Sequence, residues 1–143
     1  EKVGEDLYRI DRLYEEDYKV VVSKSHPLSE LNTISLSTLA KTDMLDRLNC
    51  EMRDALFGTC ADQGHELYAA YRSNRVDWLV ELARQGLGAV ILPATAIPSD
   101  IGLVSKPIDG LEISRTVVAL RYRHQTTRPE TNDLIREMTR TPA

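Results

Sequence analysis

Two cysteines, Cys50 and Cys60, are the residues of this chain whose type best suits covalent or redox chemistry. The pattern predicts a helix over residues 50–63 with Asn49 as its cap. The start of a helix favours a thiolate, although Glu51 beside Cys50 opposes that charge. Cysteines ten residues apart on one helix are separated by roughly 15 Å along the axis, whereas a disulfide needs Cα atoms within about 7 Å. Pairing would require the helix to unwind, so we expect inert, at least partly buried thiols.

Binding of a small anion is the second kind of chemistry that the residues predict. Ligands of open α/β sheets lie beyond the carboxyl ends of strands, where helix N-termini present free backbone N–H groups. Three such places are residues 46–50, residues 72–74 and residues 92–95. We therefore expect a carboxylate or similar anion as ligand, bound by Arg47, Asn49, Cys50, Ser73, Asn74 and Pro93. The alternative is that the two asparagines and Ser73 are ordinary helix caps, and acidic residues in the first helical turns would partly cancel the attraction.

The remaining residues predict neither catalysis nor a metal site. His26, His65 and His124 are scattered, and no cysteine lies at a metal-ligand spacing from them. The chain contains no nucleophile-elbow, phosphate-loop or zinc-protease motif. We therefore predict a binding protein that is not an enzyme and that uses no cofactor and no metal.

Strands that alternate with helices are predicted to position these residues. Predicted strands cover residues 7–13, 18–23, 43–48, 66–72, 89–92, 102–108 and 113–123, and predicted helices cover residues 34–40, 50–63, 76–85 and 126–140. Ser35 is the expected cap of the first helix, and Asn74 is the expected cap of the third. Trp78, on the third helix, is assigned to the core rather than to a partner subunit. The alternation predicts an α/β domain with a mostly parallel sheet whose opening half-unit has been cut away.

Length, composition and charge are those of one globular domain. The chain has 143 residues, 42% of them hydrophobic, and a net charge of −4. Lysines and arginines do not cluster as they do on nucleic-acid-binding surfaces. No run is long enough to span a membrane and no signal peptide opens the chain, so we expect no membrane partner. Two cysteines without extracellular features indicate a reducing cytoplasm, and a start at Glu1 without Met indicates a fragment.

Five motifs follow one another in a recognisable order. They are the acidic and apolar stretch 13–22 followed by His26-Pro27-Leu28, the Ser-Leu-x-x-Leu-Ala helix 34–40, Arg53 followed by Gly64, the glycine turn with its apolar strand and proline at 86–93, and the strand 115–120. Each motif is loose, but together they resemble the effector-binding domain of LysR-type bacterial transcription regulators.

The resemblance implies a domain similar to the type II periplasmic solute-binding proteins, with two α/β lobes that face each other across a cleft. Residues 1–24 would form part of the first lobe and the first crossing strand. Residues 25–111 would form the second lobe, and residues 112–143 would form the second crossing strand and a helix that returns to the first lobe. The chain would be an incomplete fragment, without the DNA-binding domain and the start of the first lobe.

The function implied is that of a cytoplasmic regulator controlled by a small-molecule effector bound in the cleft. It would assemble as a homodimer or higher homo-oligomer, partly through the helix over residues 76–85. It would bind DNA only through the absent N-terminal domain.

Two other functions stay open. In the peroxide-sensing branch of the same family, a reactive cysteine, an Arg-Asp pair and a second cysteine occupy places that match Cys50, Arg53-Asp54 and Cys60. This likeness would make Cys50 and Cys60 a redox pair, but one extra residue separates Cys50 from Arg53 here, and Asn49 replaces a histidine of that branch. The other alternative is a transport-type solute-binding protein of the same fold.

Overall fold

A computed structural model describes residues 7–99 and 101–140, and the chain divides into two units. Unit 2 consists of Asp17–Ile113, and unit 1 consists of Glu1–Glu16 together with Ser114–Ala143. Unit 2 contains most of the predicted strands and helices and all of the predicted ligand-binding residues.

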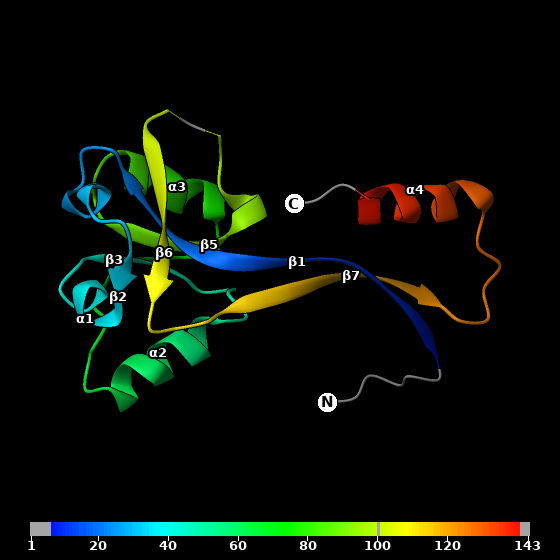
Figure 1. The fold of residues 1–143 in the computed structure, drawn as a ribbon, viewed down its shortest axis with the longest axis horizontal. Helices are drawn as coiled ribbons and strands as arrows, with labels where there is room; N and C mark the ends of the chain where they lie inside the picture. Colours follow the sequence, from blue (N-terminus) through cyan, green and yellow to red (C-terminus); the bar gives the residue numbers. More distant parts are fainter. Residues whose placement is uncertain (1–6, 100, 141–143) are drawn as a thin grey trace. The chain divides into compact units, whose positions relative to one another are not determined.

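Unit 2 is a mixed sheet covered by helices on both faces (Figure 1). Its strands are the part of β1 (Tyr8–Ser23) from Asp17 onward, β2 (Ile34–Ser35), β3 (Met44–Arg47), β4 (Ala69–Ser73), β5 (Ala89–Pro93) and β6 (Leu103–Asp109). Its helices are α1 (Leu36–Leu39), α2 (Arg53–Asp62) and α3 (Val76–Arg84), with short 3-10 turns at Pro27–Glu30 and Ala94–Ala96.

The strands of unit 2 are ordered β2-β6-β1-β5-β3-β4. The three strands β5, β3 and β4 are parallel, as the alternation with helices predicted. However, β1 is antiparallel to both β5 and β6, so the sheet is mixed rather than mostly parallel. In addition, β1 is one continuous strand of 16 residues, where the sequence predicted two separate strands.

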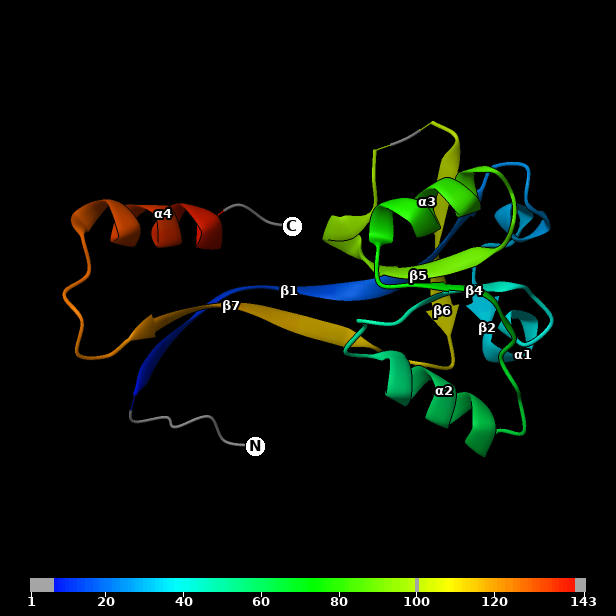
Figure 2. The ribbon, with the colours of Figure 1, turned by 180° about the vertical axis from the view of Figure 1, so that it is seen from behind.

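The two faces of the sheet have separate apolar cores. Helix α3 covers one face, and α1 and α2 lie on the other (Figure 2). On α3, the buried residues Leu79, Val80 and Ala83 follow the predicted helical spacing. Among the described residues, no helix is long and apolar enough to cross a membrane.

The residues at the starts of α1 and α2 can be compared with the predicted helix caps. The prediction for Ser35 is confirmed, because its Oγ accepts a hydrogen bond from the backbone N–H of Thr38 at 3.2 Å. The prediction for Asn49 is wrong, because α2 begins at Arg53 and the residue that precedes it, Met52, makes no side-chain cap. Cys50 therefore lies in a turn before the helix, and not in its first turn.

The third predicted helix also starts one residue later than the Asn74 cap requires. Its cap position is occupied by Arg75, without a side-chain hydrogen bond. Ser73 Oγ accepts a hydrogen bond from the backbone N–H of Arg75 at 3.0 Å. The side chain of Ser73, rather than that of Asn74, therefore stabilises the turn before α3.

Trp78 corrects another prediction. Its side chain is 61% exposed on α3, so its assignment to the core is wrong. The sequence contains the reason, because Trp78 lies off the apolar stripe of α3, which consists of the half-buried Val76 and the buried Leu79, Val80 and Ala83.

Unit 1 pairs the first part of β1 with β7 (Ser114–Tyr122), followed by helix α4 (Pro129–Arg140). Arg121 connects these elements: its Nη2 lies 2.6 Å from Asp11 Oδ2, and its Nη1 lies 2.7 Å from Asn132 Oδ1. Glu16 is buried and accepts from Arg115 Nε at 2.7 Å. No residue of α4 is buried, although the helix is amphipathic.

Candidate functional site

The carboxyl ends of β3, β4 and β5 form one edge of unit 2. The last residues of β3 and β4, Arg47 and Ser73, are register partners, and the backbone N–H of Leu48 donates to the carbonyl of Ser73 at 3.0 Å. The third parallel strand, β5, adjoins β3 and ends at Pro93. The structure thus brings the predicted residues Arg47 and Ser73 together by parallel pairing.

A turn of residues 48–52 connects β3 to α2 and contains the predicted residues Asn49 and Cys50. Asn49 is exposed, and its carbonyl accepts from Arg47 Nη2 at 3.5 Å. Cys50 is half-buried, and its carbonyl accepts from the backbone N–H of Arg53 at 3.2 Å. Glu51 is exposed, and its carboxylate accepts a hydrogen bond from the hydroxyl of Tyr18 on β1.

Asp46 is a buried carboxylate that the sequence analysis did not single out. Arg53 Nε lies 2.9 Å from Asp46 Oδ1, and Arg53 Nη2 lies 2.8 Å from Asp46 Oδ2. Arg72 Nε lies 3.3 Å from the same Oδ2. This hydrogen bonding raises the pKa of Arg53, whose guanidinium also lies 4.5 Å from the centroid of the Phe57 ring. One carboxylate therefore ties together β3, β4 and the first residue of α2.

A small hollow lies beside this cluster, between α2 and the sheet. It is lined mostly by apolar side chains, and its polar members are Asp46, Arg47, Cys50 and Arg53. The Nη1 of Arg47 is buried and has no hydrogen-bond partner among the described residues. Because a buried guanidinium N–H without an acceptor is costly, this atom favours an anionic or other acceptor group at the hollow.

The start of α3 carries less free positive charge. Arg75 forms an ion pair with Asp77 at 2.5 Å, and this contact lowers the pKa of Asp77. The guanidinium of Arg75 also lies 5.4 Å from the ring of Trp78. Asn74 is exposed, and the hydroxyl of Ser73 is already bonded to the backbone of Arg75. The site at Arg47, before α2, is therefore better suited to an anion than the site at the start of α3.

The two cysteines differ in their surroundings. Cys60 is fully buried in α2, and this burial raises its pKa. Cys50 is half-buried in the turn, so the expectation that both lie on one helix is wrong. Both thiols are free. The pair therefore consists of one half-buried thiol and one fully buried thiol.

Of the three histidines, His26 has a local structural role. Nδ1 of His26 accepts from the backbone N–H of Leu28 at 3.1 Å, and burial lowers the pKa of His26. Within residues 7–99 and 101–140, no group of three or more histidine, cysteine, aspartate or glutamate side chains could hold a metal ion.

Comparison with known proteins gives a family match, a similar curated protein and similar solved structures. The sequence profile described as LysR substrate binding domain matches residues 3–143. A hydrogen peroxide-inducible genes activator of Pectobacterium carotovorum subsp. carotovorum is 29% identical over 116 residues, which cover 78% of this chain and 38% of that protein.

Two solved structures share the fold over nearly all of the chain. The Synechocystis PCC6803 CcmR regulatory domain in complex with 2-PG has a TM-score of 0.78 at 15% identity, and the match covers 100% of this chain and 73% of that chain. A reduced form of OxyR from N. meningitidis has a TM-score of 0.67 at 25% identity, and the match covers 97% of this chain and 66% of that chain.

Proposed function

Since the chain belongs to the LysR substrate-binding domain family, whose members are transcriptional regulators and not enzymes, we propose that it senses a small-molecule effector for such a regulator. The fold is that of the type II periplasmic-binding-protein-like domains, present here in part. The chain spans 37% to 38% of the length of the curated relatives that it matches. DNA binding through an N-terminal domain, control of transcription and a cytoplasmic location are therefore proposed for the parent protein.

The proposed lobes follow the family pattern. Residues 25–111 would form the second lobe, and residues 1–24 and 112–143 would belong to the first lobe and the two crossing strands. The effector would bind at the edge of the second lobe where β3, β4 and β5 end. A shift in the equilibrium between two arrangements of the lobes would then carry the signal.

We propose that the effector is a small anion, most simply a carboxylate. The observation that carries this proposal is the buried Nη1 of Arg47, which has no partner among the described residues. The rest of the site would consist of the backbone at Asn49 and Cys50, of Ser73 and Asn74 between β4 and α3, and of Pro93. The 2-PG of the Synechocystis relative is a precedent for effector binding in this fold, not an identification of the effector.

Stabilisation by anions tests this proposal. Thermal unfolding of the chain is measured with succinate, benzoate, inorganic phosphate and 2-PG, each against sodium chloride of equal ionic strength. We expect at least one of these anions to raise the melting temperature, because a ligand that binds only the folded state stabilises it. Arg47→Met is expected to weaken binding of that anion at least about tenfold, as for loss of a charge-assisted hydrogen bond.

Arg12→Met is the matched control, because Arg12 is an exposed arginine of unit 1 that pairs with Glu15. This variant should respond to the anion as the unaltered chain does. The anion proposal is wrong if no member of the panel stabilises the chain, or if Arg47→Met responds fully.

We further propose that a second copy of the chain binds α3. The exposed ring of Trp78 supports this, because large exposed aromatic side chains are typical anchors of protein interfaces. In sedimentation velocity over a range of concentrations, we expect dimers that Trp78→Ser weakens at least about tenfold. Tyr68→Ser, which alters an aromatic side chain of similar exposure outside α3, should leave the association unchanged. A monomer at every concentration would contradict the proposed dimer.

Redox sensing is the second candidate function. It is favoured by the peroxide-responsive relatives and by the half-buried position of Cys50. Redox sensing requires the fully buried Cys60 to leave the apolar core and pair with Cys50. The raised pKa of Cys60 opposes this step, because it disfavours the reactive thiolate. A disulfide between Cys50 and Cys60 after peroxide treatment would favour this function, whereas a Cys60 that stays reduced would contradict it.

A further inference from the structure

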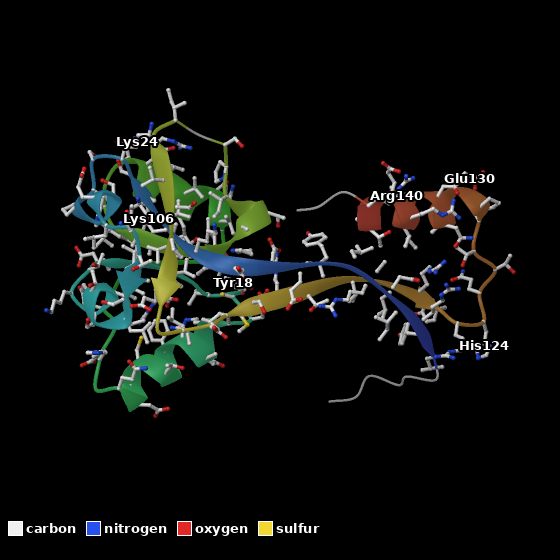
Figure 3. All side chains as sticks on the ribbon, viewed as in Figure 1. Tyr18, Lys24, Lys106, His124, Glu130 and Arg140 are labelled. Atoms are coloured by element: carbon white, nitrogen blue, oxygen red, sulfur yellow. The ribbon has the colours of Figure 1, made fainter. Side chains whose placement is uncertain are left out.

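Tyr18 occupies a special place in unit 2. It is the second residue of the unit and lies on β1 (Figure 3). The residue as a whole is only 3% exposed. Its backbone N–H donates to the carbonyl of Ile113, the last residue of the unit, at 3.1 Å. It is also the register partner of Pro93 at the end of β5. Tyr18 is therefore held firmly by its backbone and by the packing of its ring.

The hydroxyl of Tyr18 reaches a residue 33 positions away in the sequence. It donates a hydrogen bond to the carboxylate of Glu51, in the turn between β3 and α2. The residues next to Glu51 are Cys50 and Met52, and both line the hollow that also contains Arg47. A rigid strand residue thus anchors an exposed turn at the proposed effector site.

We propose that the hydrogen bond from Tyr18 to Glu51 is a latch that keeps the turn of residues 48–52 closed. While the latch is closed, Cys50 stays half-buried and the hollow beside Arg47 stays narrow. When it opens, the turn swings away from β1, and both Cys50 and the hollow become accessible. The effect of the latch on effector entry rests on the proposed function, whereas its effect on Cys50 does not.

The physical basis is a local opening equilibrium. A half-buried thiol reacts with a bulky reagent only while its surroundings are open, so its rate reports the open fraction. Cys60 is fully buried in the core and reacts only when the core itself opens. The two thiols therefore give two separate rates, one for the turn and one for the core.

The test measures these rates with 4,4′-dithiodipyridine, an uncharged reagent, on the whole chain at a pH where the fast rate has reached its plateau. At that plateau the ionisation of the thiol no longer limits the rate, and an uncharged reagent is insensitive to the charge of Glu51. Cys50→Ser is used to identify the fast phase, because this variant must lose it.

Tyr18→Phe removes the hydroxyl and keeps the buried ring. We expect it to raise the plateau rate of Cys50 about fivefold, the factor equivalent to about 1 kcal/mol for one hydrogen bond, and to leave the rate of Cys60 unchanged. Glu51→Ala should have the same effect. Glu51→Gln retains an acceptor oxygen and should stay close to the original rate.

Tyr71→Phe is the control for loss of a tyrosine hydroxyl, because Tyr71 lies exposed on β4. It should change neither rate. The latch is wrong if Tyr18→Phe leaves the rate of Cys50 unchanged, or if it accelerates Cys50 and Cys60 equally, which would indicate general destabilisation.

The anion experiment separates the two proposals. A faster Cys50 in Tyr18→Phe without stabilisation by any anion would support the latch and refute the anion effector. The reverse result would retain the effector site and refute the latch.

Discussion

Replacing Gly88 by alanine is expected to lower the free energy of unfolding by about 3 kcal/mol or more, since it combines backbone strain with a steric clash. Gly88 has φ +158° and lies directly before β5. A Cβ there would lie 2.4 Å from the carbonyl oxygen of Asp43, a contact too short for a methyl group. The same oxygen accepts the hydrogen bond from Ala89 N–H at 2.9 Å, so the methyl would push apart the beginnings of β3 and β5.

Two other glycines make this prediction specific. Gly64 has φ +76° and nothing within 4 Å of the place that a Cβ would take, so Gly64→Ala should show the backbone cost alone, about 1 kcal/mol. Gly58 lies inside α2 with free space around it, so Gly58→Ala should be stabilising by up to about 1 kcal/mol. Urea unfolding followed by circular dichroism measures all three. If Gly88→Ala lowered the free energy of unfolding no more than Gly64→Ala does, this would show that β3 can move at Asp43 to make room for the methyl group.

Local patterns predicted most elements of unit 2 because their residues carry the signal themselves. The valines of β1 and the short apolar run of β5 lie at their predicted places. Ser35 acts as the predicted cap, because its partner Thr38 is three residues away. In such cases the residues that decide the structure lie within one turn of each other.

The start of α2 could not be predicted in the same way. Asn49 has a good capping side chain, but the helix begins four residues later, at Arg53. Arg53 is bound to Asp46, and Glu51 to Tyr18 on another strand. These contacts depend on the sheet and on residues distant in sequence, so tertiary structure overrides the local preference.

In the candidate site, too, some features could be predicted from the sequence and others depend on tertiary contacts. The alternation of strands and helices implies parallel strands. Because the carboxyl ends of parallel strands lie at the same edge of a sheet, Arg47 and Ser73 lie together there. The ion-pair cluster around Asp46 depends on the register that sets Asp46 opposite Arg72, and no spacing in the sequence gives that register. The exposure of Trp78 was readable from its place off the apolar stripe of α3.

Replacing Asp46 by alanine is expected to lower the free energy of unfolding by about 3 kcal/mol, the lower end of the range for breaking a buried ion pair. The side chain of Asp46 is 3% exposed, and those of Arg53 and Arg72 are 28% and 59% exposed. Without the carboxylate, Arg53 loses its bidentate acceptor while its guanidinium still lies against Phe57. Because the carboxylate is buried, added salt should reduce the loss only slightly.

Asp54→Ala is the matched control, because Asp54 neighbours Arg53 but its side chain is fully exposed and 4.0 Å from the guanidinium. Its effect on the free energy of unfolding should be much smaller than that of Asp46→Ala, because surface ion pairs contribute little to stability. Equal effects of the two variants in urea unfolding would show that Asp46 contributes no more than a surface charge. A large difference would show that one buried carboxylate fixes where α2 begins. Since Arg53 is the first residue of α2 and the turn of residues 48–52 leads into it, Asp46→Ala should also speed the reaction of Cys50 with 4,4′-dithiodipyridine, even though Tyr18 and Glu51 are unchanged.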